Sequence, residues 1–227
     1  MSYQGLRSVL PAPLARYVMY FEAEIERTVE SFAARLPKGA SVLDAGAGEG
    51  NYKGHFARQI YTGLDLGVGD QQWDYSRLDV VGDLAALPFP DQHFDAGVNV
   101  VTLEHVRDPH RVIQELGRVL KTGGQLLLIA PHEWEVHQQP HDYFRYTRYG
   151  LQHLLEQAGF AKIEVRPVGG YFRLMSRRLL NGLQFFPGPL MLVAGLFLAP
   201  PALVFPLLDG LDRDKNFTLG YVCIAQK

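Results

Sequence analysis

Residues 42–50 read Val42-Leu43-Asp44-Ala45-Gly46-Ala47-Gly48-Glu49-Gly50, an apolar run followed by an acid and then by spaced glycines. The apolar residues predict a short buried strand. The glycines predict a sharp turn from this strand into a helix, where a ligand can approach the main chain closely. A glycine-rich turn alone also fits an ordinary tight turn or the phosphate loop of a dinucleotide enzyme.

Strand and helix patterns alternate along the chain around this stretch. Apolar residues spaced by three and four predict a helix from Pro13 to Leu36. Further helices are expected at 109–120, before the turn at 121–124, and after an N-cap at Thr147. Strands are expected at 41–44, 60–64, 78–81, 95–101, 125–130, 161–166 and 219–226. This alternation predicts an α/β fold with a doubly wound, mostly parallel sheet of Rossmann-like type.

Acidic residues follow the first three expected strands. Asp44 ends the first, Asp65 ends the second about 20 residues further on, and Asp83 follows the third together with Leu84. Ligands bind at the carboxyl ends of strands in open α/β sheets, so we expect these acids to share one crevice. A carboxylate at Asp44 would oppose a pyrophosphate and suits a ligand that carries an ammonium and a sulfonium group.

Several motifs together resemble the class I S-adenosylmethionine-dependent methyltransferases, in particular the type 11-like subgroup that acts on small molecules and lipids. The resemblance covers about residues 40–165 and the last strand, and it implies a seven-stranded sheet with an antiparallel last strand. The matching motifs are 44–50, Gly63-Leu64-Asp65, Gly82-Asp83-Leu84, Leu87-Pro88-Phe89-Pro90-Asp91, Phe94-Asp95-Ala96, 103–109 and Leu120-Lys121-Thr122-Gly123-Gly124.

This resemblance implies S-adenosylmethionine as the cofactor and a role for each matching residue. Asp44, Gly46 and Gly48 would hold the methionine moiety. Asp65 would hold the ribose, and Asp83 with Leu84 the adenine. A main-chain group near Val100 would bind the amino group, and Glu104 and His105 would lie over the cofactor at the next helix. Packing at the helix end is the alternative interpretation of Glu104 and His105.

Two other functions compete with methyl transfer. A nicotinamide-dependent oxidoreductase is disfavoured, because the pattern after the fifth strand gives a helix and a hairpin strand instead of a second nucleotide-binding half. A domain that binds the cofactor without catalysis, as a partner subunit, stays open.

Histidines gather after the fifth strand, in the segment 131–147. A hydroxyl acceptor benefits from a general base, and histidine suits that task near neutral pH. His137 and His141 are the candidate bases, with Asp142 to orient or replace them; a hydrogen-bonded surface loop is the alternative. The spacing matches no common closed metal site, so no metal ligand is expected.

The segment 140–147 weakly resembles methyltransferases encoded among sugar and cell-envelope genes. That resemblance suggests O-methylation of a small-molecule, glycan or lipid-linked acceptor.

Composition limits the remaining classes of function. The formal net charge of -2 argues against a broad nucleic-acid surface. The single cysteine, Cys223, excludes an intramolecular disulfide and is expected to be a buried thiol. Residues 1–16 lack the apolar core of a signal peptide, so a cytoplasmic location is expected.

An apolar insertion separates the last two strands. We expect one methyltransferase domain over 1–227, with a helical cap at 1–38, a core at 39–166 and 218–227, and the insertion at 167–217. Residues 185–208 carry no charge, but prolines are expected to break them into two short helical pieces hinged near Pro200-Pro201. The segment is expected to form a homodimer interface, a lid over an apolar substrate, or a shallow hairpin on the cytoplasmic membrane. In the last case Arg173, Arg177 and Arg178 would meet anionic headgroups.

Overall fold

The computed structural model describes residues 11–69 and 73–227, so expectations about residues 1–10 lie outside it. The described chain forms two compact units. Unit 1 holds residues 11–24 and Pro167–Gly220, and unit 2 holds Ile25–Arg166 and Tyr221–Lys227. The insertion expected from residue 167 therefore begins where unit 2 passes into unit 1. The assignment of the whole chain to one methyltransferase domain stays a prediction.

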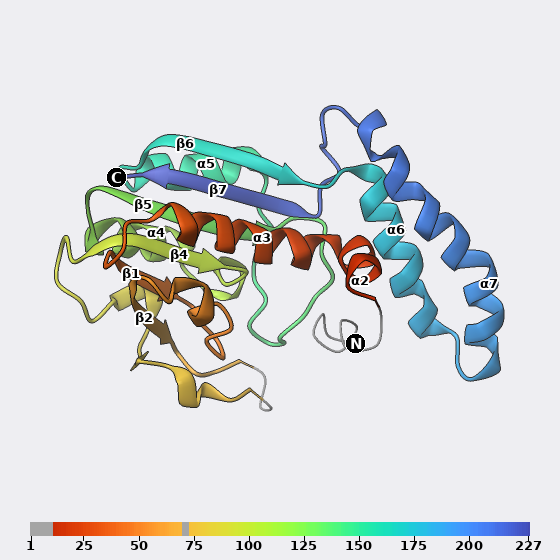
Figure 1. Ribbon diagram of the computed structural model, residues 1–227, viewed down its shortest axis with the longest axis horizontal. Helices are drawn as coiled ribbons and strands as arrows, with labels where there is room; N and C mark the ends of the chain where they lie inside the picture. Colours follow the sequence, from red (N-terminus) through yellow and green to blue (C-terminus); the bar gives the residue numbers. More distant parts are fainter. Residues whose placement is uncertain (1–10, 70–72) are drawn as a thin grey trace. The chain divides into compact units, whose positions relative to one another are not determined.

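A seven-stranded sheet has the order β3-β2-β1-β4-β5-β7-β6. Its strands are β1 Ser41–Ala45, β2 Ile60–Asp65, β3 Val80–Val81, β4 Phe94–Val100, β5 Leu120–Pro131, β6 Ala161–Val168 and β7 Gly220–Gln226. The pairs around β1 and β4 are parallel, and β7 runs against its neighbours (Figure 1). This arrangement confirms the expected Rossmann-like sheet with an antiparallel last strand.

Helices cover both faces of the sheet. α3 Tyr20–Arg35 lies on one face, and α4 Pro109–Val119 and α5 Arg148–Gln157 lie on the other (Figure 1). Between them, residues 126–130 of β5 are fully buried, as expected for a central parallel strand. Thr147 caps α5 as predicted, because its side chain accepts a hydrogen bond from the Gly150 N–H. Cys223 is buried, as predicted, and burial raises the pKa of its thiol to about 12.

Three local expectations were wrong. The helix predicted over 13–36 is divided at Met19 into α2 Ala12–Val18 and α3; the apolar spacing continues across the break, so periodicity could not show it. The turn expected at 121–124 lies inside β5, which already begins at Leu120 with an irregular register. Gly123 and Gly124 form main-chain hydrogen bonds with Lys227 there. The turn after β1 leads into the short 3-10 helix η1 Lys53–Phe56, where an α-helix was expected.

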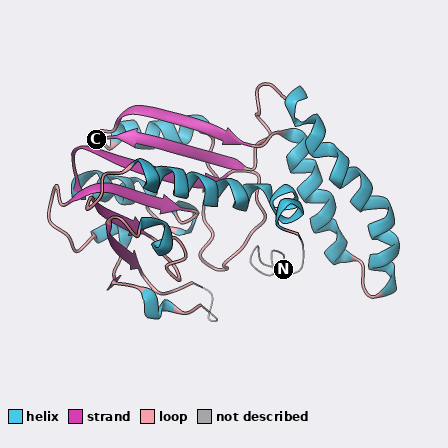
Figure 2. Ribbon diagram, viewed as in Figure 1, coloured by secondary structure: helices cyan, strands magenta, loops and turns pink. Residues whose placement is uncertain are grey.

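The insertion in unit 1 is helical apart from short connections (Figure 2). It contains α6 Tyr171–Gly182, η5 Leu183–Phe185, α7 Pro189–Val204 and η6 Phe205–Leu211. The expected break at Pro200-Pro201 is wrong, because α7 continues through both prolines. They lie in its last turns, where their fixed φ suits a helix, and the Phe205 N–H restores the hydrogen-bond pattern by donating to the Pro201 carbonyl.

Two of the arginines expected to meet lipid are engaged inside unit 1. Arg177 Nη1 donates to Glu22 Oε1 at 2.9 Å. The Arg173 guanidinium lies 3.6 Å from the centre of the Tyr20 ring and forms an ion pair with Asp209. These side chains therefore tie α6 to the neighbouring segments of unit 1, which argues against the expected headgroup contact.

Candidate cofactor and active site

A cavity of about 660 Å³ lies at the carboxyl edge of the sheet in unit 2. Its volume is typical of small-molecule sites, and its lining combines apolar with polar and charged residues. Most residues predicted to bind the cofactor line it, together with one of the predicted bases. These residues are Gly46, Gly48, Asp65, Asp83, Leu84, Val100, His105 and His141.

The glycine-rich turn brings bare main chain to this cavity. Gly46 and Gly48 have φ angles of 89° and 53°, in the left-handed region that favours glycine. A Cβ on Gly46 would overlap the side chain of Thr102, whose hydroxyl donates to the Gly46 carbonyl at 3.2 Å. Thr102 also lines the cavity, and no sequence motif had pointed to it. Only glycine therefore fits at position 46.

Asp65 fixes the loops around the cavity. Its Oδ2 accepts the Gly48 N–H at 2.9 Å, and its Oδ1 accepts the Gly67 N–H at 2.8 Å. Asp83 caps the next short helix by accepting the Ala85 N–H at 2.8 Å. Both carboxylates still contribute to the cavity lining, so the acids after β2 and β3 do share one crevice.

Asp44 lies behind the lining and is almost fully buried. Tyr61 donates to its Oδ2 at 2.6 Å, whereas its Oδ1 has no hydrogen-bond partner among the described residues. Burial raises the pKa of Asp44 to about 7. A buried carboxylate oxygen without a donor fits a nearby cationic ligand.

Backbone strain marks the end of β4. Val101, which lines the cavity beside Val100, has a φ of 51°. A positive φ is a genuine outlier for a β-branched residue, and such strain gathers at functional sites. Its N–H donates to the Ile129 carbonyl at 2.8 Å, which holds the strained conformation against β5.

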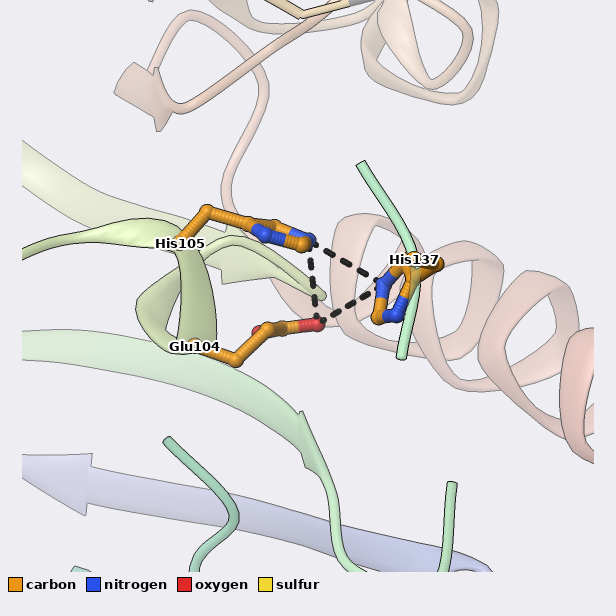
Figure 3. A group of neighbouring side chains, drawn as sticks. All are labelled: Glu104, His105 and His137. Carbon is orange, nitrogen blue, oxygen red and sulfur yellow. Dashed lines mark hydrogen bonds and ion pairs between the residues drawn. The ribbon is translucent and has the colours of Figure 1, made fainter. Parts of the chain in front are cut away.

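Beside the cavity, which His105 lines, the side chains of Glu104, His105 and His137 point toward one another (Figure 3). His105 Nε2 lies 3.1 Å from His137 Nε2 and 3.6 Å from Glu104 Oε1, and His137 Nε2 lies 3.8 Å from the same oxygen. Glu104, expected over the cofactor, is fully buried in the short helix η4 Leu103–His105. Burial raises the pKa of Glu104 to about 8 and lowers the pKa of His105.

The predicted bases occupy different places. His141 lines the cavity, and its Nδ1 lies 3.2 Å from the hydroxyl of Tyr143, which also accepts from Arg107 Nε. His137 and Asp142 lie behind the lining. Asp142 accepts the His137 N–H at 2.9 Å and pairs with Arg145, whose hydrogen bond lowers the pKa of Asp142 to about 2.

The sequence interpretation missed several lining residues, among them Trp73, Thr102, Arg107 and Gln138. Two of them fall within motifs already noted, at 103–109 and 131–147, but nothing in those patterns separated them from their neighbours. Trp73 lies in the irregular segment between β2 and β3, which carries no periodic signal.

Comparison with known families and proteins agrees with this geometry. Residues 43–128 match the family model described as "Methyltransferase domain". A demethylmenaquinone methyltransferase of Bacillus licheniformis is 32% identical over 126 residues, covering 50% of this chain and 54% of that protein. A tRNA (carboxymethyluridine(34)-5-O)-methyltransferase of Arabidopsis thaliana is 31% identical over 49% of this chain and 28% of its own length. The chain thus spans about half or less of these relatives.

Solved structures share the fold at low sequence identity. A SAM-dependent methyltransferase of Archaeoglobus fulgidus has a TM-score of 0.60 at 13% identity, covering 90% of this chain and 94% of its own. The cyclase SpnF has a TM-score of 0.60 at 24% identity, covering 89% of this chain and 81% of its own. Because one of these proteins is named a cyclase, the fold alone does not specify the reaction.

The cavity itself fits the cofactor of this family. The glycine cradle, the acids Asp65 and Asp83, and the unpartnered oxygen of Asp44 suit a nucleoside with a cationic tail. The sheet order, the match over 43–128 and these strand-end acids lead to one conclusion: the chain carries a class I S-adenosylmethionine-dependent methyltransferase domain.

Proposed function

We propose that the protein binds S-adenosylmethionine in the strand-end cavity and catalyses methyl transfer to a hydroxyl group of a small-molecule, glycan or lipid-linked acceptor. The observation that carries this proposal is one cavity lined by the glycine turn, by Asp65 and Asp83, and by His141. The residues that we assign to cofactor binding and the candidate base thus surround a common space.

The acids support a cationic cofactor over a dinucleotide. Asp44 lies directly below the glycine turn, where a pyrophosphate would meet its carboxylate. An ammonium or sulfonium group would instead favour the ionised form of Asp44. Asp65 and Asp83 follow the next two strands, and we assign them to the ribose and the adenine, with Leu84 against the base. The main chain at Val100 is assigned to the amino group of the cofactor.

His141 is the group that we assign to the acceptor. When bound, the cofactor supplies a methyl group on a sulfonium that leaves as a thioether. A tautomer in which His141 Nδ1–H donates to Tyr143 leaves Nε2 free to take the hydroxyl proton as the oxygen–carbon bond forms. Methyl transfer is an in-line displacement, so the other lining residues act mainly by positioning the acceptor.

We further infer that the insertion attaches the protein to a membrane surface. The segment Pro189–Leu211 is long and apolar enough to cross a membrane, by length and composition only. Its large exposed residues, including Leu192, Leu196 and Phe197, form a broad apolar face on the side of α7 away from Ala202, which packs against Ser176 of α6. An exposed apolar face of this extent marks a contact surface, and the absence of charged residues from 185–208 favours lipid as the contact. Since β6 and β7 pair in one sheet, the insertion must leave and return on one side, which favours a hairpin dipping into one leaflet.

A labelled-methyl assay tests the proposed function. Extracts would be incubated with the protein and cofactor carrying a labelled methyl group, and then divided into lipid and aqueous fractions. We expect acid- and base-stable label in a hydroxyl-derived ether, with the lipid fraction favoured by the membrane proposal. Label on carbon or nitrogen would refute O-methylation, and no transfer by protein that binds the cofactor would favour a non-catalytic role.

A further inference from the structure

We propose that Glu104, His105 and His137 form a binding site for one divalent transition-metal ion. The three residues come from η4 and from the segment after β5, and each offers one ligand atom to a common point (Figure 3). This site goes beyond the proposed methyl transfer and does not depend on it.

The distances fit a metal ion closely. The atoms His105 Nε2, His137 Nε2 and Glu104 Oε1 form a triangle with sides of 3.1, 3.6 and 3.8 Å. The point equidistant from its corners lies about 2.0 Å from each atom. Zinc binds histidine nitrogen and carboxylate oxygen at roughly 2.0–2.2 Å. The side chains would therefore need little movement to hold an ion.

Hydrogen bonds to the other ring nitrogens prepare both histidines as ligands. His105 Nδ1 lies 2.6 Å from the carbonyl of His141, and His137 Nδ1 lies 3.1 Å from the carbonyl of Glu135. Carbonyls only accept, so both Nδ1 atoms carry hydrogen in neutral rings, and both Nε2 lone pairs face each other. Metal-binding histidines are held in this way by donating their second N–H to a carbonyl or carboxylate.

Glu104 provides an independent observation. Its side chain is fully buried, and neither carboxylate oxygen has a hydrogen-bond partner among the described residues. The cation beside it, Arg145, donates instead to Asp142 and to carbonyls of its own segment. The carboxyl of Glu104 and the two Nε2 lone pairs thus face one another, an arrangement that a shared proton or a single metal ion resolves.

The donor set indicates the class of metal. Two imidazoles with one carboxylate suit zinc, iron(II), cobalt(II) or nickel(II), whereas magnesium and calcium prefer oxygen ligands. Three protein ligands also leave coordination positions open, as in catalytic zinc sites. Because His105 lines the cavity, an ion here would lie beside the proposed active site.

Metal titration of the full chain, after treatment with chelator, tests the site. We expect one equivalent of Zn²⁺ to bind by calorimetry, one equivalent of Co²⁺ to give a visible absorption spectrum, and millimolar Mg²⁺ to leave both unchanged. Glu104→Gln should weaken binding at least about 100-fold yet fold well, because its amide can donate to the facing nitrogens. His137→Ala, on the loop, gives a second variant, and the exposed His153→Ala is the matched control.

Two results would overturn the proposal. Equal Zn²⁺ affinity in the wild type, Glu104→Gln and His137→Ala would show adventitious binding at surface histidines. Absence of Zn²⁺ and Co²⁺ binding by folded wild-type protein would show that a shared proton, and not a metal ion, links the three side chains.

Discussion

The strand-end cavity of unit 2 and the α7–η6 segment of unit 1 go against ordinary folding preferences in opposite ways. Around the cavity, the carboxyl groups of Asp44 and Glu104 are buried without donors for some or all of their oxygens. In α7–η6, large apolar side chains such as Phe197 and Leu207 are exposed. Burying an unsatisfied polar group costs on the order of 1–3 kcal/mol, and large exposed apolar patches normally mark contact surfaces. Each departure indicates a partner of matching character, cationic in unit 2 and apolar in unit 1.

Catalysis should depend on the cavity of unit 2, and the largest expected effect is at His141. His141→Ala should lower the rate of methyl transfer by about 10²- to 10⁴-fold, the usual cost of losing a general base. Cofactor affinity should stay close to wild type, because His141 is assigned to the acceptor. Single-turnover kinetics with calorimetry of cofactor binding separates the two effects, with the exposed His153→Ala as control. Unchanged turnover in His141→Ala would remove histidine from this role.

Gly46→Ala should abolish detectable cofactor binding, a loss of at least about 100-fold. The added Cβ meets Thr102 and also occupies a left-handed conformation that costs roughly 1–2 kcal/mol. Gly39→Ala is the matched control, since Gly39 has a φ of 79° but open space around its Cβ position. Calorimetry on both folded variants checks this. Equal affinity in the two would mean that the glycine cradle does not contact the cofactor.

Phe197→Asp tests the proposed membrane contact of the α7–η6 segment in unit 1. A charged side chain in the apolar interior of a membrane is unfavourable by about 2.5–3.5 kcal/mol, so vesicle binding should weaken by about 70- to 400-fold. Tyr149→Asp in unit 2 is the matched control, because Tyr149 is 75% exposed and Phe197 is 74% exposed. Cofactor affinity should be the same in both variants.

Co-sedimentation with zwitterionic vesicles, and with vesicles that contain anionic lipid, measures this effect. Because Arg173 and Arg177 are engaged within unit 1, we expect only weak dependence on anionic lipid and on salt. If the wild-type protein stays in solution as a stable dimer and becomes monomeric on Phe197→Asp, the apolar face of α7 contacts a second copy of the chain and not a membrane.

The smallest expected effect is a pH dependence from Asp44. Its pKa of about 7 lies above the ordinary value of 3.8, so the folded protein holds a proton that the unfolded chain has lost. This contribution to stability is complete below pH 3.8 and is lost as pH rises toward 7. A cationic cofactor favours the ionised form, so its affinity should rise up to about tenfold per pH unit between pH 5 and 7 and then level off.

Asp44→Asn separates stability from binding at this position. The variant should bind the cofactor more weakly at pH 7.5, with little change between pH 5 and 7. Its free energy of unfolding should exceed that of the wild type above pH 7, on the order of 2–4 kcal/mol. Calorimetry and urea unfolding across this pH range give both quantities. A wild-type affinity independent of pH would separate Asp44 from the cofactor.

Sequence reasoning succeeded where the pattern is local or follows sheet topology. The strand-end acids Asp65 and Asp83 reached one cavity because carboxyl ends of parallel strands share an edge. Thr147 was recognised as a cap because a cap acts within one helical turn. By contrast, the convergence of Glu104 with His137 depends on how the segment after β5 folds back over η4. No spacing rule encodes that return, so the spacing of the histidines alone did not predict a metal site.

The insertion shows a different limit of sequence reasoning. Proline at 200 and 201 predicted a break, since proline removes a helical hydrogen bond. α7 stays continuous because both prolines lie in its last turns, where only a few carbonyls lose their donors. The strained Val101 was equally hidden, because a positive φ at valine has no signature in composition or periodicity.

Calorimetric titration of the folded, full-length chain with three ligands tests the central claim most directly. We expect S-adenosylmethionine and its demethylated product each to bind at one site with micromolar affinity, while NAD gives no binding heat. Heat with NAD, or no heat with either methyl-cycle ligand, would contradict the assignment of the strand-end cavity to this cofactor.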